Sequence, residues 1–148
     1  FQGVLKVMEK LLNIIKCEKL YLGEKDFQQL FIIRNFIKIN KFKTKIVNCK
    51  TIRNKNMLAY SSRNILLSKN NIIEAGNILN FMIKLKKKYK KFNIVKKIII
   101  SKLKLKKIKY DYIENINITN FKTTNNLNKQ SRIFIAFYMN KIRLIDNY

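Results

Sequence analysis

Two short segments of the sequence combine residue types that suit the binding of phosphate groups. The first is Gly23-Glu24-Lys25-Asp26-Phe27-Gln28-Gln29, in which a glycine ends an expected strand and charged and amide side chains begin the next expected helix. Ligands bind at the carboxyl ends of strands in open α/β sheets, and a helix N-terminus attracts anions. Lys25 is therefore a candidate for neutralising a phosphate, and Asp26 for accepting hydrogen bonds from sugar hydroxyls. The same spacing also fits a capping box formed by Asp26 and Gln29, which needs no ligand.

The second candidate segment is Leu58-Ala59-Tyr60-Ser61-Ser62-Arg63-Asn64. The adjacent hydroxyls of Ser61 and Ser62 are donors suited to polyphosphate oxygens. The guanidinium of Arg63 adds a forked, permanently charged contact that a lysine cannot reproduce. Serine, arginine and asparagine are also ordinary loop residues. The tetrapeptide Ser61-Ser62-Arg63-Asn64, taken alone, therefore fits equally a loop that binds no ligand.

The first segment needs a strand and a helix to position it, and the sequence predicts both. Residues 4–15 carry apolar side chains at intervals of three and four, the pattern of an amphipathic helix. A short apolar strand at 19–22 leads into Gly23, a second helix follows at 26–39, and a second strand at 45–49. Helix, strand, helix and strand in this order predict a parallel α/β unit.

The character of the chain changes beyond Thr51. We expect an irregular stretch at 52–67, a helix capped by Ser68 and running to about Tyr89, a helix at 95–106 in which Ile98–Ile100 equally suit a strand, and antiparallel strands at 108–118, 132–138 and 141–145. A tight turn at Met139-Asn140 would join the last two strands, and residues 119–130 would form a loop. The chain therefore divides near Ile52 into two regions, 1–51 and 52–148.

Composition limits the chemistry that these segments can perform. The chain has 148 residues, of which 33 are basic and 8 acidic, and its net charge of +25 normally favours nucleic acid or an anionic surface as a partner. Lysine, asparagine and isoleucine are abundant together, as an AT-rich coding sequence would produce without selection for basicity, and this weakens that inference. Because there is no histidine, catalysis would depend on lysine, arginine, carboxylate, hydroxyl, thiol or backbone groups.

Other features concern metals and location. Cys17 and Cys49 are isolated thiols, so we expect no zinc site, no other metal site and no disulfide framework, and a reducing cytoplasm is the simplest compartment. No apolar run reaches the ~20 residues needed to cross a bilayer, and the N-terminus lacks the layout of a signal peptide, so no membrane partner is expected. The chain begins at Phe1 rather than at a methionine, which suggests a fragment.

Four segments in a fixed order carry a family resemblance. They are Tyr21-Leu22-Gly23-Glu24-Lys25-Asp26-Phe27-Gln28-Gln29-Leu30, Thr51-Ile52-Arg53, Leu58-Ala59-Tyr60-Ser61-Ser62-Arg63-Asn64 and Arg143-Leu144-Ile145-Asp146-Asn147. Together they resemble the landmarks of the pantothenate synthetase family, the pantoate–β-alanine ligases. Phe1-Gln2-Gly3-Val4 also resembles the family's entry into the helix before the first landmark. The resemblance covers nearly all of this chain, but only about the C-terminal half of a complete family member.

The resemblance implies an α/β fold in which residues 1–51 are the C-terminal part of a Rossmann-like domain for ATP and pantoate. Residues 52–148 would be a small α+β lid domain with an antiparallel sheet. It also implies an AMP-forming ligase of pantothenate and coenzyme A biosynthesis. In that reaction pantoate attacks the α-phosphate of ATP to give pantoyl adenylate and pyrophosphate, and β-alanine then displaces AMP to give pantothenate. ATP with Mg²⁺, pantoate and β-alanine would be the partners, and a full-length chain would form a homodimer.

The resemblance assigns roles to residues of the first landmark. Gly23 would lie against the nucleotide, and Lys25 would hold phosphate oxygens. Asp26 would bind the ribose of ATP, and Gln29 the pantoate.

Residues of the two middle landmarks would complete the nucleotide site. Ile52 would meet the adenine through its backbone, and Ser61, Ser62 and Arg63 would bind the phosphates. Together with Lys25 these last three would be the catalytic groups, since cationic and hydrogen-bonding donors stabilise the charge that grows on phosphates under attack.

The sequence also departs from the family at several positions. Leu22 stands where the family usually has Phe, Lys50 where it has Pro, Met57 where it has Gly, and Tyr60 where it has Leu or Met. The last two lie beside the phosphate-binding serines and put the flexibility of that loop in question. The family's His-x-Gly-His motif belongs to its N-terminal half, so this chain would supply about half of an active site. Without that half, we expect the face of the sheet that carries Leu20 to be exposed.

A basic RNA-binding or ribosomal protein is the alternative class. Its best evidence is the span Lys84–Lys109, in which thirteen of twenty-six residues are lysine, with Tyr89 and Phe92 among them. Solvated helix faces in a lysine-biased protein explain the same span. Arginine, the residue best suited to reading bases, is scarce there. We therefore do not expect nucleic acid as a partner.

Overall fold

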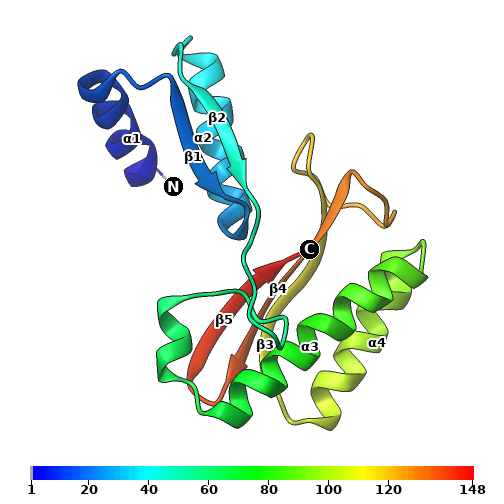
Figure 1. Cartoon of the computed structure of the whole chain (residues 1–148). Coiled ribbons are helices and arrows are strands. Elements are labelled where there is room, and N and C mark those ends of the chain that lie inside the picture. The colour runs from blue at the N-terminus through cyan, green and yellow to red at the C-terminus, as the bar shows by residue number, and fades with distance from the viewer. Residues whose placement is uncertain (1) are drawn as a thin grey trace. The chain divides into compact units, whose positions relative to one another are not determined.

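The computed structural model of this chain describes residues 2–148 and divides it into two compact units, Phe1–Thr51 and Ile52–Tyr148 (Figure 1). Phe1, the first residue of the Phe1-Gln2-Gly3-Val4 resemblance, lies outside the described residues. Each unit has its own hydrophobic core.

The first unit is a parallel pair of strands packed with two helices. Its elements are α1 (Gln2–Ile15), β1 (Lys19–Gly23), the short 3₁₀ helix η1 (Glu24–Asp26), α2 (Phe27–Ile39) and β2 (Lys45–Cys49). β1 and β2 pair in parallel, with Leu20 opposite Ile46 and Gly23 opposite Cys49. The predicted parallel α/β unit is confirmed. Because the strands are parallel, both of their carboxyl ends lie at the same edge of the pair.

The core of this unit is small. Leu12 of α1 and Ile33 and Ile37 of α2 are buried, and Leu20 and Ile46 of the strands pack against them. The expectation that the Leu20 face would be exposed is therefore wrong, because the unit's own helices cover that face. The exposed apolar side chain of β1 is Tyr21, which is 62% exposed. Successive side chains of a strand point to opposite faces, so Tyr21 belongs to the other face of the pair.

The second unit packs two long helices against an antiparallel sheet (Figure 1). Its elements are η2 (Ser62–Leu66), α3 (Lys69–Lys88), α4 (Phe92–Leu105), β3 (Tyr110–Asn117), β4 (Ser131–Met139) and β5 (Ile142–Asn147). The three strands are antiparallel, as predicted, and their order in the sheet is β3-β4-β5, with Ile113 opposite Ile135 and Phe137 opposite Leu144. One core joins the layers, and its fully buried side chains include Ile78, Leu79, Met82, Val95, Ile99, Leu103, Ile133 and Phe137.

Local signals predicted most, but not all, of these boundaries. Ser68 caps α3 as expected, because its hydroxyl accepts a hydrogen bond from the Asn71 amide at 3.2 Å. α4 begins at Phe92 rather than at Val95, since the distant loop residue Asn125 accepts hydrogen bonds from the first amides of the helix. The turn between β4 and β5 is at residues 140 and 141, one residue later than predicted, because Met139 still pairs with Ile142.

The helix predicted at 95–106 is therefore confirmed, and its strand alternative is wrong. Ile99 is 1% exposed in the helix core, whereas Lys97 and Ser101 on either side of it are exposed. Within residues 2–148, no helix has the length and apolar character that a membrane-spanning segment needs.

Candidate functional site

The first candidate segment lies where β1 ends. Gly23 closes the strand with an ordinary extended backbone, φ −72° and ψ 132°. A Cβ built at Gly23 would meet no atom within 4 Å, so the chain's own packing does not require a glycine there, and the space beside its backbone is open. Lys25 follows half-buried in η1, and Gln29 lies half-buried in the first turn of α2. These side chains therefore extend from the carboxyl edge of the parallel pair.

The capping box of Asp26 and Gln29 does not form. Asp26 precedes α2 with φ −96° and ψ 56°, which is not the extended conformation of a capping residue, and its side chain makes no capping hydrogen bond. Within its own unit, the described residues provide no hydrogen-bond or ion-pair partner for this carboxylate, which is exposed. The structural explanation for Asp26 therefore fails, and its carboxylate remains able to accept hydrogen bonds from a ligand.

A chain of polar contacts fixes the backbone around this segment. Arg34 of α2 donates to the side-chain oxygen of Asn48 at 2.7 Å, and the Asn48 amide donates to the Glu24 carboxylate at 3.5 Å. Asn48 belongs to β2 and Glu24 to η1, so the contacts tie the neighbouring strand and helix to the turn that carries Lys25 and Asp26.

The second candidate segment is supported by a narrow loop at 52–60. The Tyr60 amide donates to the Ile52 carbonyl at 3.1 Å, and the Asn54 amide donates to the Leu58 carbonyl at 2.9 Å. The Asn54 side-chain oxygen accepts from two further amides inside the loop. Leu58 and Ala59 are 3% and 2% exposed, whereas the Ile52 side chain is 73% exposed. The loop is therefore anchored at its far end and presents Ile52 to its surroundings.

Ser61, Ser62 and Arg63 follow directly. Ser61 caps η2, its hydroxyl accepting from the Arg63 amide at 3.3 Å. The Asn64 side chain donates to the Ala59 carbonyl at 3.0 Å, which fastens η2 to the loop. The Ser62 and Arg63 side chains are exposed and find no hydrogen-bond or ion-pair partner among residues 2–148. The backbone of the segment is thus held while its donors remain available.

The sequence did not predict a buried ion pair between Arg53 of the 52–60 loop and Asp146 of β5. Arg53 donates from Nη1 to Asp146 Oδ2 at 2.6 Å and from Nη2 to Asp146 Oδ1 at 2.9 Å, with side-chain exposures of 13% and 2%. Both residues belong to landmark segments, but neither was assigned a role. The available signal was the alternation of β5, in which Asp146 shares the buried face with Leu144 and therefore needs a partner.

The departure at Met57 has a structural consequence. Met57 has φ 72°, the left-handed region in which a glycine is the least strained residue. The glycine that the resemblance leads us to expect at this position would fit this backbone without strain, whereas the methionine adopts it with strain.

The lysine-rich span contributes to the second unit's own structure. Lys102 lies 3.7 Å from the centre of the Phe81 ring. Lys106 pairs with Glu74 at 2.7 Å. Lys86 donates to the Ser131 and Tyr148 carbonyls, and burial, with a smaller contribution from Arg132, lowers its pKa to about 8.

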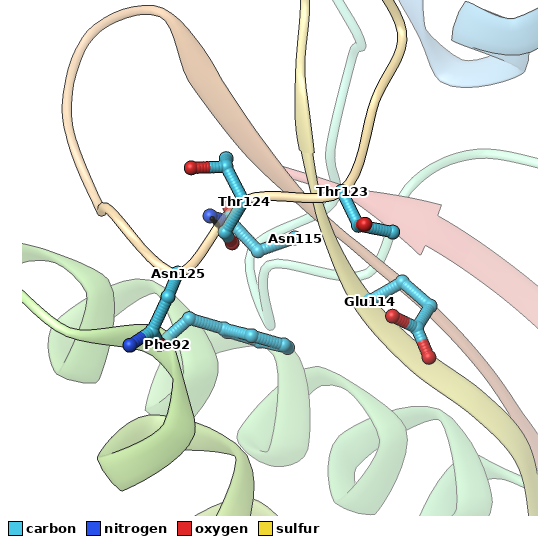
Figure 2. A pocket seen from close by; sticks show the side chains of 6 residues that line it. All are labelled: Phe92, Glu114, Asn115, Thr123, Thr124 and Asn125. Carbon is cyan, nitrogen blue, oxygen red and sulfur yellow. Dashed lines mark hydrogen bonds between the residues drawn. The ribbon is translucent and has the colours of Figure 1, made fainter.

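One cavity of the second unit contains none of the expected site residues (Figure 2). It has a volume of about 260 Å³ and is lined by Phe92, Glu114, Asn115, Thr123, Thr124 and Asn125. Asn115 of β3 donates to the Thr124 and Asn126 carbonyls at 2.9 and 3.0 Å, and these bonds hold the 118–130 loop against β3. Its side-chain oxygen is buried and has no hydrogen-bond partner among the described residues. The cavity lies at the junction of this loop with the start of α4.

Known proteins resemble the whole of this chain. The pantothenate synthetase of Flavobacterium psychrophilum is 40% identical over 154 residues, which cover 99% of this chain and 54% of that protein. The pantothenate synthetase of Clostridium botulinum strain Loch Maree is 38% identical and is covered to the same 54%. The chain therefore spans about half the length of the curated relatives it matches.

Solved structures share the fold. The pantothenate synthetase of Thermus thermophilus superposes with a TM-score of 0.89 at 25% identity, over all of this chain and 55% of that chain. The pantoate-beta-alanine ligase of Francisella tularensis, complexed with beta-gamma ATP and beta-alanine, gives a TM-score of 0.73 at 36% identity, over 99% of this chain and 49% of that chain. The family model of pantoate-beta-alanine ligase matches residues 1–148, and the chain belongs to that family.

Proposed function

We propose that this chain carries the C-terminal half of a pantoate–β-alanine ligase active site. With an N-terminal half supplied, it would condense pantoate with β-alanine through pantoyl adenylate and release AMP and pyrophosphate. The observation that supports this most directly is the state of the landmark side chains. Asp26, Ser62 and Arg63 are exposed and unpartnered within their own units, on segments whose backbones are fixed by hydrogen bonds. Groups arranged in this way are available to a ligand.

In the first unit, the proposed contacts are with the nucleotide and pantoate. The open space beside Gly23 would let a nucleotide approach the backbone closely. Lys25 would hold phosphate oxygens, the free carboxylate of Asp26 would accept hydrogen bonds from the ribose hydroxyls, and Gln29 would bind pantoate.

In the second unit, the proposed contacts are with the adenine and the phosphates. Ile52 would meet the adenine through its backbone, at the exposed start of the loop. Ser61, Ser62 and Arg63 would bind the phosphates. Ser61 already uses its hydroxyl oxygen to accept from the Arg63 amide, but its hydroxyl proton can still be donated.

The chemistry requires electrostatic stabilisation rather than a protein nucleophile. Attack of the pantoate carboxylate on the α-phosphorus builds negative charge on the phosphate oxygens, and preorganised donors lower the free energy of that state. Lys25, Ser61, Ser62 and Arg63 are the donors we assign to this task. Mg²⁺, when bound with ATP, would neutralise phosphate charge. Residues 2–148 contain no group of three or more carboxylate or thiol side chains that could hold a metal ion, so the phosphates would supply most of its ligands.

The two units have distinct parts in this proposal. Residues 1–51 would be the end of the ATP- and pantoate-binding domain, and residues 52–148 the lid domain. A full-length enzyme would be a homodimer. The free thiols of Cys17 and Cys49 fit a reducing compartment, and we place the enzyme in the cytoplasm.

The test compares the 148-residue chain with a fusion in which the N-terminal half of the Flavobacterium psychrophilum relative precedes it. The fusion should form pantothenate from ATP, pantoate and β-alanine, and the chain alone should not. Without the N-terminal half, the chain would not hold the reactants in alignment. Alignment can lower the activation free energy by ~7–11 kcal/mol. Equal rates for the two proteins would show that the phosphate-binding residues have been misplaced.

Ligand binding gives a second readout that does not need turnover. The fusion should bind ATP in calorimetry, and Asp26→Ala should weaken that binding, whereas Glu9→Ala, an exposed carboxylate of α1, should not. Unchanged ATP affinity in Asp26→Ala would refute the role assigned to this carboxylate.

A further inference from the structure

The loop that precedes Ser61, Ser62 and Arg63 is held by an ion pair rather than by apolar packing alone. Besides its two bonds to Asp146, the Arg53 guanidinium donates to the Met57 carbonyl at 3.0 Å and to the Asn147 carbonyl at 3.2 Å. One side chain therefore connects the tip of the loop to β5. Both charges are almost fully removed from water, so each depends on the other for compensation.

A continuous set of bonds leads from this ion pair to the phosphate-binding segment. Arg53 and Ala59 lie opposite each other in an isolated antiparallel bridge, so the position of Arg53 determines that of Ala59. The Ala59 carbonyl accepts from the Asn64 side chain, and the Asn64 amide in turn donates to the Ser61 carbonyl at 3.0 Å. A displacement of Arg53 would thus be passed to the backbone of Ser61.

The 52–60 loop also packs against α3, and at Gly76 the loop backbone is in direct contact with the helix. A Cβ at Gly76 would lie 1.9 Å from the Asn56 carbonyl oxygen, so the loop backbone rests directly on the helix. Met57, the next residue, keeps its left-handed φ of 72°. A strained conformation of this kind persists only where the surroundings determine the backbone.

We infer that Arg53 and Asp146 are positioning residues for the phosphate-binding segment Ser61-Ser62-Arg63. Neither would touch the nucleotide. Their ion pair fixes the loop against β5, and the loop presents the hydroxyls of the two serines and the guanidinium of Arg63 in one arrangement. This inference rests on the proposed function, because it takes the segment to be the phosphate site. Donors that must meet several phosphate oxygens at once lose affinity when their common support moves by a fraction of an ångström.

The experiment titrates the 148-residue chain with inorganic pyrophosphate and follows the backbone amides of Ser62 and Arg63 by NMR. Two variants perturb the pair. Asp146→Asn removes the negative charge while keeping the shape, and Arg53→Lys keeps the positive charge but cannot span both carboxylate oxygens. Each should bind pyrophosphate at least about tenfold more weakly, the equivalent of one charge-assisted contact. If Asp146→Asn fails to fold, the test depends on Arg53→Lys, because a lysine at position 53 still places a positive charge beside the buried carboxylate.

Two controls separate positioning from loss of stability. Asp111→Asn breaks a different arginine–aspartate pair, Arg143 Nε to Asp111 Oδ2 at 2.6 Å, whose described hydrogen bonds join β3, β4 and β5. Ile99→Val lowers core stability without contacting the segment. Both should retain wild-type pyrophosphate affinity at a temperature where every variant is folded.

The outcomes are distinct. Saturable shifts in the wild type that weaken in the two pair variants and persist in the two controls support the inference. Wild-type binding that the pair variants reproduce overturns the positioning role and leaves the proposed function intact. A wild type whose Ser62 and Arg63 amides do not respond to pyrophosphate overturns both. Equal weakening in Ile99→Val would show that global stability, not positioning, is responsible.

Discussion

Substitution of Gly76 by alanine tests the contact between the 52–60 loop and α3. The new Cβ would lie 1.9 Å from the Asn56 carbonyl oxygen, 2.8 Å from its carbonyl carbon and 2.9 Å from its Cβ. Ordinary contact begins near 3.4 Å, so the loop would have to retreat by roughly 1.5 Å if α3 kept its place. Overpacking of this kind costs ~1–3 kcal/mol, against a gain of up to ~1 kcal/mol in helix propensity.

We therefore expect Gly76→Ala to lower the stability of the second unit by up to about 2 kcal/mol, and each kcal/mol lowers the unfolding midpoint by roughly 4–8 °C for a unit of this size. Scanning calorimetry measures the midpoint, and amide shifts of residues 54–58 report the displacement of the loop. Gly3→Ala is the matched control, because a Cβ at Gly3 in α1 meets nothing within 4 Å and should not destabilise the chain. If Gly76→Ala matched that control in calorimetry and left the loop amides unchanged, the close approach inferred here would be wrong.

The remaining predictions concern single side chains and one shared ligand. Met57→Val should be less stable than Met57→Gly in chemical unfolding, because a β-branched residue tolerates a φ of 72° least; the reverse order would contradict the strain argument. The folded-state pKa of Lys86, about 8, lies below its ordinary value of 10.5, so the unfolded chain binds more protons between these values and stability rises with pH across that interval. Between these two pH values the unfolding free energy of the wild type should rise relative to that of Lys86→Met. Curves that stay parallel with pH would refute the lowered pKa of Lys86. The proposed function assigns both Lys25 and Ser62 to the phosphates of ATP, so in the fusion ATP should perturb the signals of both residues at the same concentration; two unrelated titrations would contradict that assignment.

Short-range information was sufficient to predict the strands and the α-helices of both units, but not the two 3₁₀ helices η1 and η2. The parallel strands around Leu20 and Ile46 and the antiparallel strands around Ile113, Phe134 and Leu144 are where alternation and turn residues predicted them. These patterns are local because each element buries one face, and burial of a face is written into the spacing of its apolar side chains.

Boundaries that depend on distant partners were not predictable in this way. α4 begins three residues early because Asn125, more than thirty residues away, supplies the cap of its N-terminus. In the same way, the spacing of Asp26 and Gln29 suggested a capping box, but the 3₁₀ turn of η1 gives Asp26 a backbone that cannot form one. A local sequence pattern predicts a helix cap only when local interactions also determine the backbone conformation around it.

The sequence by itself determined the family and the candidate ligand groups, because these are properties of residue types in a fixed order. Only the tertiary structure revealed what supports one of these groups. Arg53 and Asp146 are 93 residues apart, and no pattern in either segment joins them. Their pairing follows from burial: folding places Asp146 on the inner face of β5, where a carboxylate is stable only beside a cation, and the loop that approaches it carries Arg53.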